Sequence, residues 1–280
     1  MALQQSLKAR LAQAVKRQEL RLTELYRHFH AHPELSGEEA RTAARVAAEF
    51  KALGLEVITG IGGHGLVGIL DRGPGPCVML RADMDALPVM EKTGLSFASR
   101  VRALDPQGQE VGVMHACGHD LHTTCLIGAA AVLSDLKDFL QGRVIFLAQP
   151  AEEAIGGARL MMAAGLYHQT GRPDLALALH VDSELPAGTV GLGPGVRSSA
   201  SHSLDVTIRG RGGHGASPHL AKDPVVLAAQ FILALQTIVT REIDPSQMAL
   251  ITVGAIHGGT KRNIIPAEVH LNLTLRAYSD

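Results

Sequence analysis

The stretch "RVIFLAQPAEE", residues 143–153, is an apolar run that ends in a proline and two glutamates. Three similar runs occur elsewhere, "LVGIL" (66–70), "CVMLRADMD" (77–85) and "LALALHV" (175–181). Alanine-rich stretches between them predict helices from about His119 to Leu136 and from about Gly157 to Ala164. Continuous apolar strands alternating with helices are typical of an α/β domain whose sheet is covered on both faces.

Polar side chains follow these runs at the points where the strands should end. Asp83 and Asp85 close one run, Glu152 and Glu153 close another, and His180 closes a third. Sheets of this kind bind ligands at strand ends, so we expect the five residues to converge. Arg81 lies on the same face of its strand as the two aspartates, and a structural salt bridge is the alternative for that pair. For Glu152 and Glu153 the alternative is a solvated acidic loop.

The segment "MHACGHDLHTT", residues 114–124, concentrates metal-binding side chains at the predicted start of a helix. Cys117 and His119 are two residues apart, and Gly118 allows the backbone to bend so that both can face one metal ion. A second hypothesis makes Cys117 a nucleophile activated by His115 or His119. That hypothesis leaves the paired glutamates and His180 without a role.

The paired glutamates suit two different tasks at a metal site. Adjacent carboxylates at a strand end point in different directions, so one can bind the metal while the other takes a proton from water. Asp83 and Asp85 could bind metal directly or hold a metal-binding histidine in the required tautomer.

From about Pro186 the sequence changes to alternating strands and glycine-rich turns. A strand, a helix from about Pro224 to Thr240 and two further strands predict a small α+β unit. We therefore expect two domains, residues 1–186 and 187–280. His214, in the turn "RGGHGASPH", is either an ordinary surface histidine or a donor to an oxyanion.

Near the N-terminus, the sequence predicts an amphipathic helix or two, followed by another helix. Apolar residues recur at helical spacing with charges between them: Leu3, Leu7, Leu11 and Val15, then Leu22 and Leu25. In "HPELSGEEARTAARVAAEFKALG", Ser36 and Glu39 have the spacing of a capping box, and Gly54 is expected to end that helix.

Composition excludes several classes of function. The 280 residues carry a formal charge of −1 with no basic cluster, which argues against nucleic-acid binding. The N-terminal segment has no unbroken apolar core of signal-peptide length, and the run "LIGAAAVL" (126–133) is far too short to span a bilayer, so we expect no membrane partner. Three cysteines without framework spacing argue against disulfides and favour a reducing compartment, so we expect a cytoplasmic protein.

These motifs resemble the hippurate hydrolase and N-acyl-L-amino-acid amidohydrolase family, which is related to aminoacylases and to hydrolases of indole-acetyl amino acids. The resemblance is carried by motifs in the family's order: "RHFHAHPELSGEE", "LRADMDALPV", "MHACGHDLHTT", "FLAQPAEE", "GGARLMMAAG", "ALHV", "GRGGHGASPHLAKDPV" and "RNIIPAEV". It implies a mixed-sheet α/β domain with a di-metal site, like that of aminopeptidases, and an inserted ferredoxin-like α+β lid that also dimerises.

Carried over position by position, the resemblance implies roles for individual residues. It implies that Cys117, His119, Glu153 and His180 are the metal ligands and that Glu152 is the general base. His214 and Asn263 match lid residues that approach the substrate, and Asp83 and Asp85 match the carboxylate strand beside the metals.

The function expected from the resemblance is metal-dependent hydrolysis of the amide bond of N-acyl amino acids such as hippurate. Two divalent ions per subunit are expected, zinc or manganese, with cobalt and nickel as further candidates. A homodimer through the lid is expected, while the acyl group and the amino acid are not specified by these motifs.

In the family a further histidine ligand lies near the C-terminus, and no histidine follows His270 here. The resemblance therefore implies a truncated chain, with both the lid and the catalytic domain incomplete. The competing hypothesis is a non-catalytic relative that binds metal or a partner protein.

Overall fold

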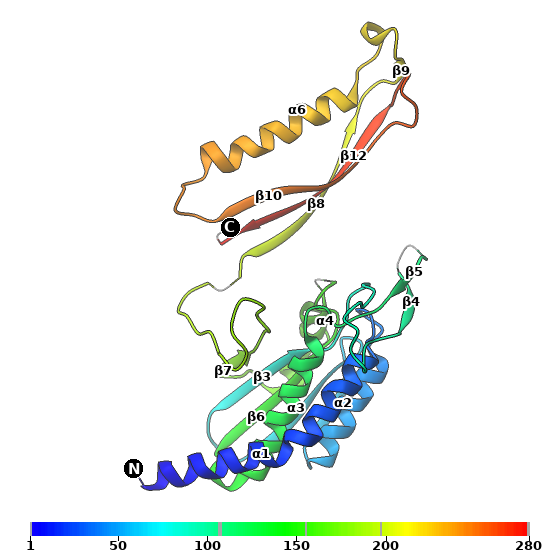
Figure 1. Ribbon diagram of the computed structural model, residues 1–280. Helices are drawn as coiled ribbons and strands as arrows, with labels where there is room; N and C mark the ends of the chain where they lie inside the picture. The colour runs from blue at the N-terminus through cyan, green and yellow to red at the C-terminus, as the bar shows by residue number, and fades with distance from the viewer. Residues whose placement is uncertain (1, 106–107, 155, 197, 279–280) are drawn as a thin grey trace. The chain divides into compact units, whose positions relative to one another are not determined.

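A computed structural model describes residues 2–105, 108–154, 156–196 and 198–278, with side chains from Leu7 onward. The chain forms two compact units, Met1–Glu184 and Leu185–Asp280 (Figure 1). The metal-binding motifs all lie in the first unit, and each unit is described separately below.

The first unit contains a five-stranded mixed sheet, as the resemblance predicted. Its strand order is β1-β2-β6-β3-β7, where β3 runs parallel to both β6 and β7 and the other pairs are antiparallel. The strands are β1 (Glu56–Ile61), β2 (Gly65–Arg72), β3 (Cys77–Asp83), β6 (Gly142–Gln149) and β7 (Leu175–Ala178). Because β3, β6 and β7 are parallel, their carboxyl ends meet at one edge, which is where the predicted site residues follow.

Helices cover the two faces of this sheet, as the alternating pattern predicted. On one face lie α1 (Ala2–Ala31), α2 (Ala40–Ala52) and α3 (His119–Asp135), and on the other α4 (Gly157–Ala163) and α5 (Leu166–Thr170). Strand β6 serves both cores, since Phe146 packs with the first set and Ile145 with the second. Successive residues of a strand point to opposite faces, so a continuous apolar run is what this position requires.

The expected covering is incomplete at β7. All four of its residues are exposed, with Leu175 at 53% and Leu177 at 52%. Shorter elements complete the unit: the hairpin β4 (Arg102–Leu104) and β5 (Glu110–Gly112) and the turn η1 (Lys137–Phe139).

The predicted capping box of α2 is wrong. Helix α2 begins at Ala40, and neither Ser36 nor Glu39 caps it with a side chain. The Ser36 hydroxyl instead donates to Asp85, and Glu39 accepts from the backbone of Gly37 and Ala151. Buried partners from distant segments have displaced the local pairing that the spacing suggested.

The N-terminal helix is present, but its first apolar positions do not enter the core. Leu7, Leu11 and Val15 are exposed by 40%, 43% and 53%, whereas Ala14 and Leu25 are buried. The early positions of the predicted apolar pattern are therefore exposed, whereas its later positions Leu22 and Leu25 pack in the core as expected. Gly54 ends α2 with a φ of 77°, as predicted.

The second unit has the predicted α+β composition. Strands β8 (Ala200–Arg209), β10 (Ala249–His257) and β12 (Glu268–Ala277) form an antiparallel sheet in the order β10-β12-β8. Helix α6 (Pro224–Thr237), continued by the π-helical turn η3 (Ile238–Glu242), packs through Ala228 against Leu271. The small pair β9 (Gly213–His214) and β11 (Ile264–Ile265) and the turn η2 (Pro218–Leu220) complete the unit.

One segment of the described residues, Pro224–Glu242, has the length and apolar composition of a membrane span. One such helix is weak evidence for a membrane span, and Ala228 of this segment packs against the antiparallel sheet.

Candidate metal centre

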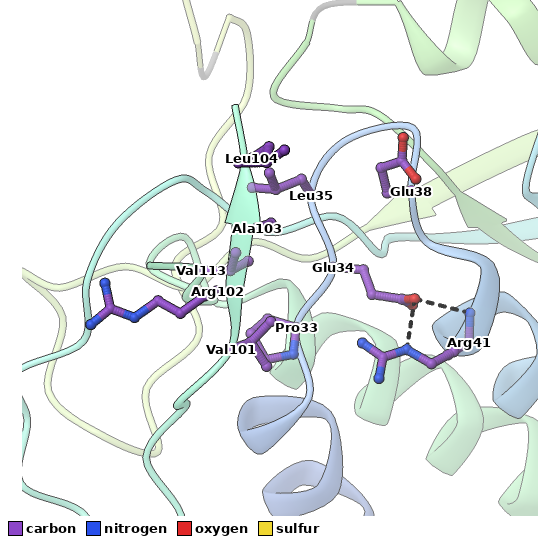
Figure 2. Close-up of a pocket in the computed structure, with 10 residues that line it drawn as sticks. All are labelled: Pro33, Glu34, Leu35, Glu38, Arg41, Val101, Arg102, Ala103, Leu104 and Val113. Atoms are coloured by element: carbon purple, nitrogen blue, oxygen red, sulfur yellow. Dashed lines mark hydrogen bonds and ion pairs between the residues drawn. The ribbon is translucent and has the colours of Figure 1, made fainter. Parts of the chain in front are cut away.

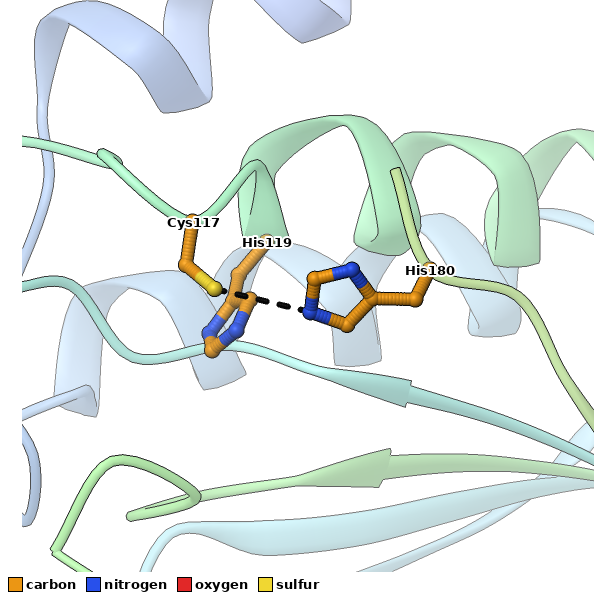
Figure 3. Close-up of side chains that lie close together, drawn as sticks. All are labelled: Cys117, His119 and His180. Carbon is orange, nitrogen blue, oxygen red and sulfur yellow. Dashed lines mark hydrogen bonds between the residues drawn. The ribbon is translucent and has the colours of Figure 1, made fainter. Parts of the chain in front are cut away.

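Cys117, His119 and His180 come together at the edge of the first unit's sheet (Figure 3). Cys117 lies in the turn before α3, His119 is the first residue of α3, and His180 follows β7. Their ligand atoms all lie within 4.8 Å of one another, and the distance from Cys117 Sγ to His180 Nε2 is 3.5 Å. The sequence predicted this grouping.

A carboxylate pair approaches the same histidine from the end of β6. His119 Nε2 lies 3.9 Å from Glu152 Oε2 and 3.8 Å from Glu153 Oε1. The Glu152 side chain is 42% exposed and the Glu153 side chain 23%. His119 therefore links the Cys117 and His180 group to the two glutamates.

The donor atoms fit a divalent cation. His119 Nδ1 lies 2.8 Å from the backbone oxygen of Asp85 and donates to it, which leaves a lone pair on Nε2. Among the described residues, neither His119 Nε2 nor Glu153 Oε1 has a hydrogen-bond partner, and both atoms are buried. Unpaired buried acceptors are costly, and thiolate, imidazole and carboxylate are ordinary ligands of zinc and related ions.

Asp83 supports the centre and also forms the salt bridge with Arg81 that was the alternative for this pair. One carboxylate oxygen accepts from His122 Nδ1 at 2.7 Å, and the other pairs with Arg81 at 2.6 Å. Burial alone would raise the pKa of Asp83, but the His122 hydrogen bond and the Arg81 charge outweigh it and lower the pKa.

Asp85 connects three segments of the centre. Its Oδ2 accepts from Ser36 Oγ at 2.6 Å and from the Glu153 backbone at 2.9 Å, while its own carbonyl holds His119. Burial alone would raise the pKa of Asp85. Hydrogen bonds from His119, Ser36 and the Glu153 backbone outweigh burial and lower this pKa to about 2. Asp85 thus stays ionised and orients both His119 and Glu153.

The surroundings of Cys117 are unfavourable for the nucleophile hypothesis. Burial, followed by the charge of Glu153, raises the pKa of Cys117 to about 12. A thiol among carboxylates is a poor nucleophile at neutral pH, whereas a bound cation would stabilise its thiolate.

Glu152 has the properties of a proton acceptor. Burial, followed by the charges of Glu153 and Asp83, raises the pKa of Glu152. A carboxylate with a raised pKa takes and returns protons more readily near neutral pH.

His122 was not singled out as a site residue, and His115 was named only as a possible activator of Cys117. His122 Nδ1 donates to Asp83, and His122 Nε2 accepts from the Val181 backbone at 2.9 Å, which fixes the chain beside His180. Its spacing of three residues from His119 on a helix was the available signal. His115 is buried with both ring nitrogens unpartnered among the described residues, and burial lowers its pKa to about 4.

His214 and Asn263 are neighbours within the second unit. His214 pairs with Ile264 across β9 and β11, and Gly215 N donates to the backbone oxygen of Asn263 at 2.9 Å. Both residues are exposed. The structure thus brings together the two residues that the resemblance assigned to the lid.

A pocket of about 430 Å³ lies elsewhere in the first unit, beside β4 (Figure 2). Its lining includes Pro33, Leu35, Arg41 and Val101 but none of the predicted site residues. The volume of a pocket therefore does not identify the candidate site in this unit. The site is identified by the potential metal-ligand atoms that lie close together.

Residues 79–269 match the model of a known family, peptidase family M20/M25/M40. The chain is 41% identical over 261 residues to N-acetyl-L-cysteine deacetylase of Bacillus subtilis, covering 93% of this chain and 60% of that protein. It is 38% identical over 256 residues to N-acyl-L-amino acid amidohydrolase of Geobacillus stearothermophilus, covering 91% and 66%.

A solved Bacillus subtilis structure, described as a dinuclear metal binding peptidase from the M20 family, has a similar fold. The TM-score is 0.75 at 31% identity, over 95% of this chain and 66% of the other. The chain spans less than two thirds of the length of the curated relatives that it matches first.

Proposed function

Since this chain belongs to peptidase family M20/M25/M40, we propose that it carries the metal centre of a hydrolase that cleaves the amide bond of N-acyl amino acids. The similarity to N-acetyl-L-cysteine deacetylase and N-acyl-L-amino acid amidohydrolase supports this substrate class. Hippurate is one member of the class.

The observation that carries the proposal is the pair of unpartnered buried atoms at the centre, His119 Nε2 and Glu153 Oε1. Cys117, His119, Glu153 and His180 would hold two divalent ions, as the dinuclear relative suggests. Bound divalent ions supply Lewis acidity to a carbonyl group and lower the pKa of water.

The chain's own residues would supply positioning and proton transfer. Glu152, partly exposed and with a raised pKa, accepts a proton from water and returns it to the leaving amine. Asp85 keeps His119 in the tautomer that offers Nε2, and His122 fixes the chain at Val181, next to His180.

The second unit would act as the lid and dimerisation domain. His214 would donate to the oxyanion of the tetrahedral intermediate, with Asn263 beside it contacting substrate. The helix α6 exposes Val226 at 56% and Leu233 at 69%, an apolar surface that supports a homodimer through this unit. We place the enzyme in the cytoplasm, which the small number of cysteines supports.

The test is metal content together with turnover of the purified 280-residue chain. After dialysis against metal-free buffer, elemental mass spectrometry should find two ions per chain. N-acetyl and N-benzoyl amino acids should release free amine, and a chelator should stop the release until zinc or manganese is restored. One ion or none, with no amine released from any substrate, would favour the non-catalytic hypothesis for this chain.

A further inference from the structure

The turn that carries the two glutamates has an unusual backbone at its first residue. Ala151 has a φ of 49°, and it is the only non-glycine residue with positive φ among the described residues. A side chain with a Cβ is strained in this region, so surrounding contacts must hold it there. Glu152 and Glu153 follow directly, and their directions depend on this residue.

Both backbone groups of Ala151 are tied to fixed partners. Its carbonyl oxygen accepts from Gly157 N at 3.0 Å, and its N–H donates to Glu39 Oε1 at 2.8 Å. At Gly157 a Cβ would lie 1.6 Å from the oxygen of Pro150, so the far side of the turn has no room for a side chain.

Glu39, directly before α2, is a fully buried carboxylate. It lies 112 residues from Ala151 in sequence and has 0% exposure. Its Oε1 also accepts from Gly37 N at 2.8 Å, while Oε2 is buried and has no partner among the described residues. Its side chain does not cap α2. A buried carboxylate is expensive, so its contact with the turn needs an explanation beyond helix formation.

The neighbouring Ser36 reaches the same turn through Asp85. Ser36 Oγ donates to Asp85 Oδ2, which accepts from Glu153 N at 2.9 Å. The loop before α2 therefore supports the turn at two points, one at Ala151 and one at Glu153.

We propose that Glu39 is a positioning residue of this hydrolase: by accepting the Ala151 N–H it holds the turn in its left-handed conformation and sets the direction of Glu152 and Glu153. The inference rests on the proposed function in so far as Glu152 is the base and Glu153 a metal ligand. Misplacing a reacting group by about 1 Å can cost on the order of 100-fold in rate.

The test compares three substitutions of Glu39 with a control in α2, the helix that follows it. Glu39→Gln keeps an acceptor oxygen for the Ala151 N–H, and Glu39→Leu removes it. Glu39→Asp keeps the carboxylate but shortens the side chain by one methylene group, which moves the oxygen away from Ala151. Thr42→Ala is the control, because Thr42 is also buried and its Oγ1 donates to Glu34 at 2.8 Å rather than to Ala151. The readouts are kcat, KM, bound metal and hydrogen exchange of the Ala151 amide.

We expect Glu39→Gln to retain kcat within about threefold and to protect the Ala151 amide as the natural chain does. Glu39→Leu and Glu39→Asp should lower kcat by roughly 30-fold or more, with KM changed by less than about threefold and with faster exchange at Ala151. Thr42→Ala should lower the melting temperature while leaving kcat and Ala151 exchange unchanged.

The outcomes separate this proposal from the function on which it rests. If the natural chain hydrolyses no substrate, the proposed function fails, and Ala151 exchange in the variants still decides whether Glu39 holds the turn. If Glu39→Leu does not fold, Glu39→Asp provides the comparison. Normal kcat and normal Ala151 protection in a folded Leu or Asp variant would overturn the positioning role.

Discussion

His119 has two ring nitrogens in different surroundings, and this difference defines the centre at the scale of the residue. Nδ1 faces the carbonyl of Asp85, while Nε2 faces Glu152 and Glu153 without a hydrogen bond. A neutral imidazole held in this tautomer is a ligand with its lone pair already directed at the carboxylates. The neighbouring side chains can then divide metal binding from proton transfer.

Glu152→Gln should abolish turnover while keeping the metal. Gln preserves the size of the side chain but cannot accept a proton, and general base catalysis contributes about 100- to 10,000-fold. The measurement is kcat on an N-acetyl amino acid together with metal per chain. Glu153→Gln is the matched comparison and should lose metal as well. A Glu152→Gln variant with a near-normal rate would remove Glu152 as the base.

Gly118→Ala should destabilise the first unit and weaken its metal binding. Gly118 has a φ of 79°, and an added Cβ would lie 2.6 Å from Val181 Cγ2, beside His180. Positive φ costs roughly 1–2 kcal/mol for alanine, and the clash should add about 1–3 kcal/mol.

Gly94→Ala is the control for Gly118→Ala in urea unfolding, because Gly94 also has positive φ, 75°, with nothing within 4 Å of an added Cβ. Equal losses in the free energy of unfolding for the two variants would mean that Val181 moves aside freely.

At the scale of secondary-structure elements, a buried histidine joins α1 to the start of α3. His30 Nδ1 lies 2.7 Å from Asp120 Oδ2, and His30 Nε2 lies 3.1 Å from Glu91 Oε1. Burial alone would lower the pKa of His30. The hydrogen bonds to Glu91 and Asp120 outweigh burial, so the pKa of His30 is raised. The charged ring thus ties three segments together next to His119.

The stability of the first unit should fall as pH rises through the raised pKa of His30. The folded-state pKa lies above the unfolded value of about 6.5, so the contribution is fully present below about pH 6.5 and is lost above the folded pKa. His30→Gln should remove this part of the pH dependence and cost about 1.5–3 kcal/mol at pH 6. Urea titrations at several pH values test this, and an unchanged slope in the variant would contradict it.

At the scale of the whole molecule, the chain divides its candidate residues between two compact units. The metal-binding cluster lies entirely within Met1–Glu184, whereas His214 and Asn263 lie in Leu185–Asp280. Metal binding should therefore stabilise the two units unequally.

Adding zinc or manganese after chelation should slow hydrogen exchange around residues 115–123 and 150–154 but not in β8, β10 and β12. A ligand at one hundred times its dissociation constant stabilises the state that binds it by about 2.7 kcal/mol. Hydrogen exchange read by mass spectrometry distinguishes the units within one sample. Equal protection of β10 and β12 would show that the metal effect is not confined to the first unit.

The sequence by itself determined the α/β unit, the following α+β unit and the grouping of Cys117 with His119. These features depend on periodicity and on residues close in the chain, such as the apolar run before Glu152. The position of His180 could also be foreseen, because strands running parallel bring their carboxyl ends to one edge.

Only the tertiary structure decided which partner each polar side chain takes. The spacing predicted that Ser36 and Glu39 cap a helix. In the folded chain Ser36 instead donates a hydrogen bond to Asp85, and Glu39 accepts one from Ala151. Likewise His122 finds partners in Asp83 and Val181, from two other segments. Spacing along the chain cannot show whether a side chain will bond a nearby backbone N–H or one that is 112 residues away. Which polar groups are buried and need a partner is decided only when the chain folds.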